Sequence, residues 1–256
     1  PLAAILGAGP AGLMAAEVLS AAGVEVHVYD AMPSAGRKFL LAGKGGLNLT
    51  HSEPLPSFIE RFGEQAAVVG DWLHDFGPQA VRDWAAGLGV GTFVGTSGRV
   101  FPTEMKAAPL LRAWLHRLRH PGAPGAVPVR FHMRHRWVGW EDTAVTPETI
   151  AAGAGQASAG GRFVFESPAG CVGLAPAAAL LALGGASWPR LGSDGAWQAW
   201  LAQAGAQVAP LAPANCGFDA AGRAGAGLPP FFAARFAGPP RKSVAVAGTA
   251  RAGRHV

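Results

Sequence analysis

Three glycines near the start of the chain have the spacing of a phosphate-binding turn. Gly7, Gly9 and Gly12 form the pattern Gly-x-Gly-x-x-Gly. In such a turn the first glycine lets the chain leave a strand sharply, the second lets backbone approach a pyrophosphate, and the third lets a helix pack closely on the sheet. The helix presents free N–H groups and the positive end of its dipole to the phosphates, and Pro10 suits its first turn. These residues predict a nucleotide site.

The elements around this turn complete a βαβ unit over residues 1–30. An apolar run, Leu2–Leu6, predicts the first strand, a helical pattern extends to Ala22, and a second apolar run, Val24–Tyr29, ends on Asp30. A carboxylate about twenty residues beyond the glycines can accept hydrogen bonds from ribose hydroxyls. It would repel a ribose that carries a phosphate. The alternative is a tight strand-to-helix turn without a ligand.

Residues 31–54 predict a basic, glycine-rich loop that returns past the phosphates. Its cations could neutralise phosphate, its glycines leave room for a flat ring, and its amide and hydroxyl groups could hydrogen-bond a polar ring edge. A solvated loop with incidental lysines is the alternative, and the residue types alone leave both open. The residues concerned are Arg37, Lys38 and Lys44, then Gly43, Gly45 and Gly46, then Asn48 and Thr50.

The composition is that of a folded protein that uses few charges. Half of the 256 residues are hydrophobic, 14% are charged, and the formal net charge is +5 with a sequence pI of about 9.9. This balance favours small anionic ligands at least as well as nucleic acid. Cys171 and Cys216 have no metal-type spacing and predict small core residues in a reducing cytoplasm. No apolar run has the length of a membrane span, so we expect a cytoplasmic protein; the oligomeric state is not predicted.

The part of the chain over residues 57–120 predicts mainly helices. A Gly-Pro break at 77–78 divides an apolar pattern of roughly helical spacing, which indicates two short helices joined by a turn, and 109–118 predicts a third. Aromatic residues at this spacing favour a packed core over a ligand-stacking site. The residues that set the pattern are Trp72, Phe76, Val81 and Trp84.

Arginines and aromatic residues are interleaved between Arg112 and Trp140, which is typical of some nucleic-acid surfaces. The stretch divides into a helix end, a Pro/Gly turn over 121–128 and one alternating strand from Val129 to Trp140, so the charges spread over several faces. We therefore do not expect nucleic acid to bind. His116 and His120 lie one helical turn apart without an apparent third ligand, so a solvated face is expected and no metal site is predicted. The arginines that this alternative would use are Arg130, Arg134 and Arg136.

A second ligand motif follows a buried strand predicted over residues 177–183. The strand is closed by Gly184 and Gly185, a loop extends to Gly195, and an amphipathic helix is predicted over 196–204. Paired glycines after a parallel strand place bare backbone at the carboxyl edge of the sheet, where open α/β sheets bind ligands. A strand, loop and helix without ligand contact is the alternative.

The stretch from Gly36 to Thr50, Gly-Arg-Lys-Phe-Leu-Leu-Ala-Gly-Lys-Gly-Gly-Leu-Asn-Leu-Thr, resembles a known signature when it follows this fingerprint. It is similar to that of the BaiN-like NAD(P)/FAD-dependent oxidoreductases, a family of bacterial flavoproteins. Many members carry Arg-Cys where this chain has Gly46-Leu47. The resemblance implies FAD at the N-terminal turn with Asp30 at the adenosine ribose, places 98–102 near the flavin, and makes the paired-glycine motif a second FAD contact.

The resemblance also implies a reaction. NAD(P)H would pass a hydride to the flavin, which would pass it to a small organic acceptor. No Ser/His/Asp, Cys/His or Cys-x-x-Cys arrangement has supporting spacing, so no catalytic residue is predicted. Arg37 is the best candidate for a functional charge, on the pyrophosphate or over the ring. The residues expected to contact FAD are Gly7, Gly9, Pro10, Ala11, Gly12, Asp30, Ala31, Gly36, Arg37, Lys38, Gly43, Gly45, Gly46, Asn48, Thr50, Val129, Gly184, Gly185 and Gly195.

The expected fold class is α/β: a Rossmann-like FAD-binding domain of the two-dinucleotide-binding superfamily, with a helical insertion and an incomplete β-rich second domain. The first domain is expected over 1–209, with strands and the second FAD motif over 129–205. The second, over 210–256, would begin a truncated β-rich substrate domain with a strand at 243–247. The alternatives from other classes are an RNA-associated flavoprotein and a non-catalytic nucleotide-binding remnant.

Overall fold

The structure is a computed structural model that divides into two compact units, Pro1–Ala209 and Pro210–Val256. In the second unit β11 (Ala245–Val246) pairs antiparallel with β12 (Gly253–Arg254), and β11 lies within the strand predicted there. The elements of the site all belong to the first unit. The residues that the structure describes are 1–42, 46–141, 162–212, 230, 245–246 and 253–254.

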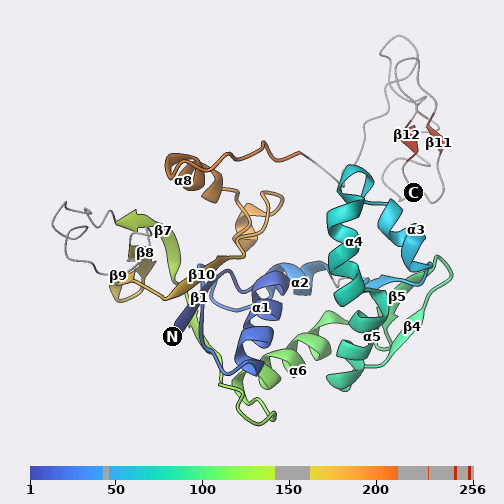
Figure 1. Ribbon diagram of the computed structural model, residues 1–256, viewed down its shortest axis with the longest axis horizontal. Coiled ribbons are helices and arrows are strands. Elements are labelled where there is room, and N and C mark those ends of the chain that lie inside the picture. Colours follow the sequence, from blue (N-terminus) through green and yellow to red (C-terminus); the bar gives the residue numbers. More distant parts are fainter. Residues whose placement is uncertain (43–45, 142–161, 213–229, 231–244, 247–252, 255–256) are drawn as a thin grey trace. The chain divides into compact units, whose positions relative to one another are not determined.

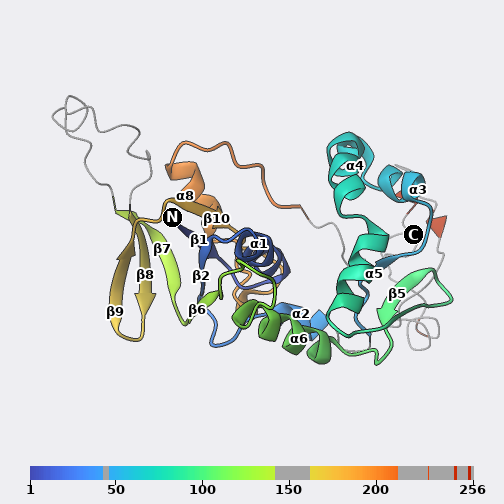
Figure 2. The ribbon, with the colours of Figure 1, turned by 60° about the horizontal axis from the view of Figure 1, so that its bottom comes forward.

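A four-stranded parallel sheet with the order β10-β1-β2-β6 organises the first unit; Figure 1 labels β10 and β1, and Figure 2 labels all four strands. In β1, Ile5 lies opposite Val28 of β2 on one side and Leu180 of β10 on the other. Because all four strands run in one direction, their carboxyl ends meet at the same edge, where ligands bind in such sheets. The strands are β1 (Leu2–Leu6), β2 (Glu25–Asp30), β6 (Arg130–Met133) and β10 (Ala178–Leu181).

Two helices cover one face of this sheet. Alternate strand residues point to this face, and Ile5 and Val28 pack there with Leu13 of the first helix and with Trp114 and Leu118 of the second, all of them buried. The alternating apolar residues of the strands and the regularly spaced apolar residues of the helices therefore pack into one core. The helices are α1 (Pro10–Ala21), as predicted from the fingerprint, and α6 (Ala107–Arg119), which confirms the predicted third helix.

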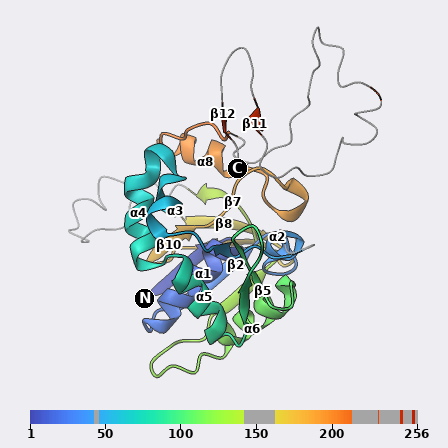
Figure 3. The same cartoon turned by 90° about the vertical axis from the view of Figure 1, so that its right-hand side faces the viewer.

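A three-stranded antiparallel sheet covers the opposite face, as the views in Figure 2 and Figure 3 show. Leu6 and Tyr29 of the parallel sheet are buried against Trp137 and Phe165 of the second sheet. The unit is therefore layered, with helices on one face and a small sheet on the other. The strands of this second sheet are β7 (Arg136–Glu141), β8 (Arg162–Ser167) and β9 (Gly170–Leu174).

The insertion between β2 and β6 is mainly helical, as predicted, and the predicted break falls between Asp75 and Pro78. It also contains a small antiparallel sheet, β3-β5-β4, which the sequence did not reveal. Its elements are α2 (Arg37–Ala42), β3 (Thr50–His51), α3 (Leu55–Glu60), the 3₁₀ turn η1 (Gly63–Gln65), α4 (Ala66–Asp75), α5 (Pro78–Gly87), β4 (Thr92–Val94) and β5 (Arg99–Pro102).

Glu17 of α1 joins the fingerprint helix to the insertion. Its carboxylate accepts the indole N–H of Trp114 at 2.5 Å and that of Trp84 at 3.2 Å, and it lies 2.6 Å from the guanidinium of Arg117. The two indole rings meet edge to face at 4.7 Å. One partly buried carboxylate thus contacts three side chains from α5 and α6, and its two hydrogen bonds from the indoles are charge-assisted and therefore stronger than neutral ones.

The prediction of a single strand over 129–140 is wrong. It is two strands in two different sheets, because Arg134 has φ 61° and turns the chain between β6 and β7. The N–H of Arg134 donates to the carbonyl of Met32, and that of His135 donates to the carbonyl of Asp30. These bonds hold the corner beside the carboxyl end of β2.

Three further expectations from the sequence are corrected. The side chain of Trp72 is 65% exposed and that of Phe76 41%, so these two aromatics are not core residues, although Trp84 packs on the core. Cys171 is exposed rather than buried, and Cys216 lies outside the described residues. The expected loop over 31–54 contains α2, whose sequence Arg-Lys-Phe-Leu-Leu-Ala is rich in helix formers.

Candidate functional site

A cavity of about 830 Å³ lies at the carboxyl ends of β1, β2 and β10. The phosphate-binding turn, the start of α2 and the segment from β10 to α8 (Trp197–Gln203) form its walls. This is the edge of an open parallel sheet where the sequence predicted a ligand, and the volume is within the range of known cofactor sites.

The three fingerprint glycines have separate structural reasons to be glycine. Gly7 has φ 113°, and a Cβ there would overlap the carbonyl oxygen of Ala182. A Cβ on Gly12 would overlap the carbonyl oxygen of Gly7, so the helix packs as closely as predicted. A Cβ on Gly9 would meet no atom within 4 Å, so the space before Gly9 is open toward a ligand. The turn therefore has the geometry predicted for a pyrophosphate cradle.

Helix α1 begins at this turn without a side-chain cap. Gly9 is its N-cap residue, Pro10 occupies the first helical turn, and no acidic residue stands in that turn. Gly9, Pro10 and Ala11 all line the cavity. The positive end of the helix dipole and the free N–H groups of the first turn thus face a cavity that suits an anion.

Asp30 lines the cavity beside this helix end. Its carboxylate accepts the N–H of Ala8 at 2.7 Å and the N–H of Met32 at 2.8 Å. Burial raises the pKa of Asp30 above its ordinary value, while the two N–H groups and the positive charges of Arg136 and Arg37 act in the opposite direction. Each carboxylate oxygen has a further lone pair, so Asp30 can also accept a hydroxyl of a ribose.

The basic residues that begin α2 line the same cavity. The N–H of Gly36 donates to the carbonyl of Ala8 at 2.9 Å, which holds the start of α2 against the phosphate-binding turn. The buried Nε of Arg37 has no hydrogen-bond partner within the part of the chain that the structure describes. Lys38 donates from Nζ to Ser187 Oγ at 2.8 Å. Arg37 and Lys38 both line the cavity, so their positive charges are candidate partners for an anionic ligand.

The second motif forms the opposite wall. Gly184 has φ 72° and lines the cavity, and its carbonyl accepts the indole N–H of Trp197 at 3.0 Å. The carbonyl of Gly185 accepts the hydroxyl of Ser193 at 2.8 Å. β10 and α8 confirm the strand and the helix predicted there, with shorter bounds.

An aromatic wall that the sequence did not predict completes the cavity. Trp137 and Trp200 meet edge to face at 4.7 Å, and Tyr29 stacks on Phe165 at 4.5 Å. These rings line the cavity from β2, β7, β8 and α8. Trp137 follows Arg136 and Phe165 precedes Glu166, but nothing local indicated that these aromatic rings meet the parallel sheet.

The residues predicted to contact FAD divide into three sets. Those that the structure places on the cavity wall remain candidates for cofactor contact, and their role in binding stays a prediction. Gly43 and Gly45, with Lys44, lie outside the described residues. The residues on the wall are Gly7, Gly9, Pro10, Ala11, Asp30, Ala31, Gly36, Arg37, Lys38, Asn48 and Gly184. Those away from the wall are Gly12, Gly46, Thr50, Val129, Gly185 and Gly195.

Val129 was predicted to contact FAD but lies away from the cavity. It immediately precedes β6, and because β6 is parallel to β2, this amino end lies at the sheet edge opposite the cavity. Its side chain is 4% exposed in the core with α1 and α6. Thr50 pairs with Val100 in the insertion sheet, and the space beside Gly46 is filled by Met105. Packing within the chain accounts for these three positions.

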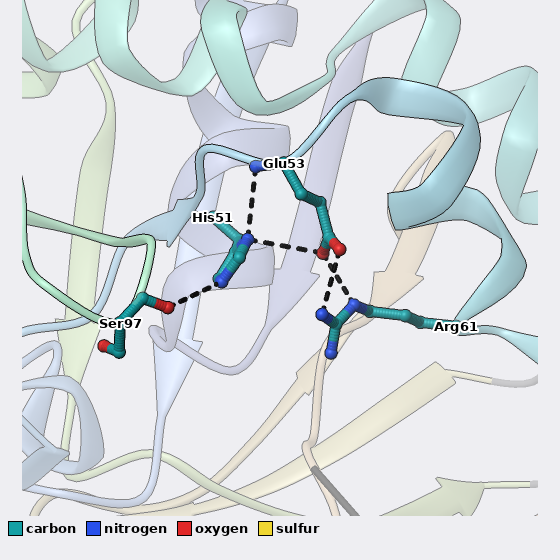
Figure 4. A network of polar contacts seen from close by, with 4 residues as sticks. All are labelled: His51, Glu53, Arg61 and Ser97. Carbon is teal, nitrogen blue, oxygen red and sulfur yellow. Dashed lines mark hydrogen bonds and ion pairs between the residues drawn. The ribbon is translucent and has the colours of Figure 1, made fainter. Parts of the chain in front are cut away.

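A second cavity, of about 370 Å³, lies in the insertion between the exit of β3 and the start of α5. His51 is fixed there by two bonds, since the N–H of Glu53 donates to its Nδ1 at 3.2 Å and its Nε2 lies 3.0 Å from the carbonyl of Ser97 (Figure 4). Nε2 must therefore carry the proton. Arg61 contacts both oxygens of Glu53, at 2.6 and 2.9 Å. These polar groups bond to one another, so the network is structural.

Other classes of site would depend on metal-type clusters, apolar helices or the interleaved arginines within the part of the chain that the structure describes. There, no group of three or more His, Cys, Asp or Glu residues is arranged to hold a metal, and no helix is long and apolar enough to cross a membrane. Arg130 lies 3.7 Å from Glu25 and Arg136 lies 3.4 Å from Asp194, on different sheets. Two of the arginines of the nucleic-acid alternative are thus paired with acidic side chains.

The parallel sheet, the glycine turn and the acid at the end of β2 define a Rossmann domain of the dinucleotide-binding kind. The chain belongs to the HI0933-like protein Rossmann domain family, whose model matches residues 2–250, a family of FAD-binding flavoproteins. No curated protein matches the sequence.

Solved structures are similar to this chain at low sequence identity. The open conformation of a flavocytochrome c3 fumarate reductase is 19% identical, with a TM-score of 0.52 over 72% of this chain and 33% of that one. A 3-ketosteroid-Δ4-(5α)-dehydrogenase from Rhodococcus jostii RHA1 is 16% identical, with a TM-score of 0.46 over 71% and 45%. The p-nitrophenol 4-monooxygenase PnpA from Pseudomonas putida DLL-E4 is 13% identical, with a TM-score of 0.40 over 74% and 42%. The chain thus spans less than half the length of each.

Proposed function

We propose that this chain binds FAD in the 830 Å³ cavity and forms the cofactor-binding part of a BaiN-like oxidoreductase. The observation that carries the proposal is the open space before Gly9, which faces the uncapped start of α1. Backbone N–H groups without a capping side chain and without a Cβ in front of them suit a pyrophosphate.

The residues around this space fit the rest of an FAD molecule. Asp30 offers carboxylate oxygens to the ribose, and the guanidinium of Arg37, which lines the cavity, offers a positive charge to phosphate. Asn48 lines the cavity and can hydrogen-bond a polar ring edge. The aromatic wall that includes Tyr29 and Trp200 excludes water and gives flat rings an apolar surface. Binding, orientation and water exclusion are the tasks of these side chains.

A bound flavin supplies hydride transfer, and we propose NAD(P)H as the donor and a small organic molecule as the acceptor. The family and the fit of the cavity support the flavin. The donor and the acceptor rest on the resemblance of the stretch 36–50 to the BaiN-like signature. The same resemblance supports the division into an FAD-binding domain and a following substrate domain over 210–256.

The first test is the visible spectrum of the purified chain, before and after addition of FAD. We expect a protein-bound flavin spectrum, release of FAD on denaturation, and bleaching by anaerobic NADH or NADPH. A Gly9→Ala variant is the matched control, because a Cβ at this position enters the space before α1 and meets no atom within 4 Å. Absence of flavin uptake by the wild-type chain would overturn the proposal.

The bleaching experiment distinguishes the FAD assignment from the proposed electron donor. If the chain binds FAD and neither nicotinamide bleaches it, the proposed donor is wrong while the cofactor assignment stands. If one nicotinamide bleaches it, the donor is identified. The acceptor is then found by the reoxidation rate of the bleached protein with candidate organic acceptors under argon.

A further inference from the structure

The segment Gly184–Gly195, here called the clasp, is a compact unit of its own. Trp188 and Ser193 form an antiparallel bridge, with N–H to carbonyl distances of 3.2 and 3.1 Å. The hydroxyl of Ser193, whose side chain is buried, returns to the carbonyl of Gly185. Internal hydrogen bonds thus keep the shape of the clasp independently of the walls that it touches.

The two ends of the clasp are glycines in the left-handed region. Gly184 has φ 72° and Gly195 has φ 73°. Only glycine adopts and leaves this region without a Cβ penalty, so a change of backbone angles at the two ends costs mainly the hydrogen bonds that Trp197 donates to Gly184 and Gln198 donates to Gly195. Rigid segments that move between two such points are the usual form of a lid over a site.

The clasp reaches both sides of the cavity through a few contacts. Ser187 accepts Lys38 Nζ of α2 at 2.8 Å, and Asp194 accepts Arg136 Nη1 of β7 at 3.4 Å. Between these attachments Gly192 lies against Met32, where a Cβ would come within 3.1 Å of the Met32 Cγ. Lys38 and Arg136 line the cavity, as do residues 191–194 of the clasp itself.

We propose that the clasp is a gate for cofactor exchange, closed by the Lys38–Ser187 and Arg136–Asp194 contacts and opened by rotation at Gly184 and Gly195. The inference rests on the proposed binding of FAD. Both contacts are solvent-exposed, and exposed pairs of this kind contribute little each. Together they can hold the clasp closed and still let it open reversibly.

The proposed gate assigns positioning roles to Ser187 and Asp194, which set how often the cavity is open. The test is the rate at which bound FAD leaves when the protein is mixed with an excess of a FAD-free flavoprotein trap, followed by flavin fluorescence. Ser187→Ala removes the acceptor of Lys38. Asp194→Asn removes the charge that faces Arg136 and keeps the oxygen that accepts the N–H of Ala196.

We expect each single variant to release FAD about threefold faster and the double variant about tenfold faster. Arg190→Ala is the control, because Arg190 is exposed in the same segment and does not line the cavity. It should release FAD at the wild-type rate. Equal rates in the wild type and the double variant would overturn the gate while the FAD assignment stands, and absence of FAD uptake by the wild type would overturn both.

Amide hydrogen exchange separates gate opening from unfolding. The N–H groups of Trp188 and Ser193 bond within the clasp, so a rigid gate keeps them protected in the double variant. Faster release with unchanged protection supports the gate. Faster release with lost protection means that the segment unfolds, and the gate is then wrong.

Discussion

The carboxylate of Asp30 accepts the backbone N–H of Ala8 at 2.7 Å, so the acid that ends β2 is bonded directly to the phosphate-binding turn that follows β1. The proposed ribose acceptor and the proposed pyrophosphate cradle are therefore one rigid piece. A change at Asp30 reaches both parts of the site, and its ionisation affects the stability of the fold as well as the ligand.

The first prediction concerns pH. Burial is the largest effect on Asp30 and raises its pKa above the ordinary value of 3.8. The folded protein then holds this proton more tightly than the unfolded chain, so the contribution of Asp30 to the free energy of unfolding is present below pH 3.8 and is lost as the pH rises through the raised pKa. Asp30→Asn should remove this dependence. Urea unfolding of both proteins across this pH range checks it, and parallel curves would contradict it.

The second prediction contrasts two glycines of one turn. Gly9→Ala adds a methyl group to open space, so the fold should persist while FAD affinity falls about tenfold or more, a loss of at least about 1.4 kcal/mol. Gly12→Ala forces a Cβ onto the carbonyl of Gly7 and should lower the free energy of unfolding by about 1–3 kcal/mol. Flavin titration and chemical denaturation measure the two effects. Wild-type FAD affinity in Gly9→Ala would count against the cradle.

The third prediction concerns the joint at Glu17. In Glu17→Gln the amide keeps one acceptor oxygen for the indoles of Trp84 and Trp114 but loses the charge that faces Arg117. The free energy of unfolding should fall by about 2 kcal/mol. Glu64→Gln, at an exposed position of η1, is the matched control and should change it by less than about 0.5 kcal/mol. Equal losses in the two variants would show that the joint contributes nothing.

The fourth prediction is that the network of Figure 4 stabilises the fold and does not affect FAD binding or flavin reduction. His51→Ala should lower the free energy of unfolding by about 1 kcal/mol, because the N–H of Glu53 and the carbonyl of Ser97 lose their partner. His51→Gln, which can still donate to Ser97, should lose less. FAD affinity and flavin reduction should match the wild type in both. A loss of flavin reduction with intact stability would give His51 a role in the site.

Local chemistry made the fingerprint predictable. Gly12 approaches the carbonyl of Gly7 within one strand-turn-helix unit, Gly7 takes the φ of 113° that the turn requires, and Asp30 follows at the end of the next strand, so spacing alone indicated all three. The helices of the insertion were predictable for the same reason, since apolar spacing and the proline at 78 are local signals.

The remaining errors concern relations between distant segments. Spacing groups Trp72 with other apolar residues, yet it does not say whether another element covers that face, and here the side chain is exposed. The turn at Arg134 contains no glycine that would have indicated it in the sequence. Its left-handed backbone is held instead by hydrogen bonds to the carbonyls of Met32 and Asp30. The aromatic wall of Trp137 and Phe165 depends on one sheet packing on another, which no local pattern states.

The pairing of β1 with β10 places Ala3 beside Ala178, so the central sheet joins the beginning of the unit to a strand made near its end. Contacts of such long sequence separation form slowly, because a large loop must close before they are gained. Until β10 arrives, the apolar edge of β1 has no neighbour on that side and the cavity lacks one wall. Cofactor capture should therefore be among the last events of folding, and added FAD should raise the yield of refolding chains rather than the speed of their early collapse.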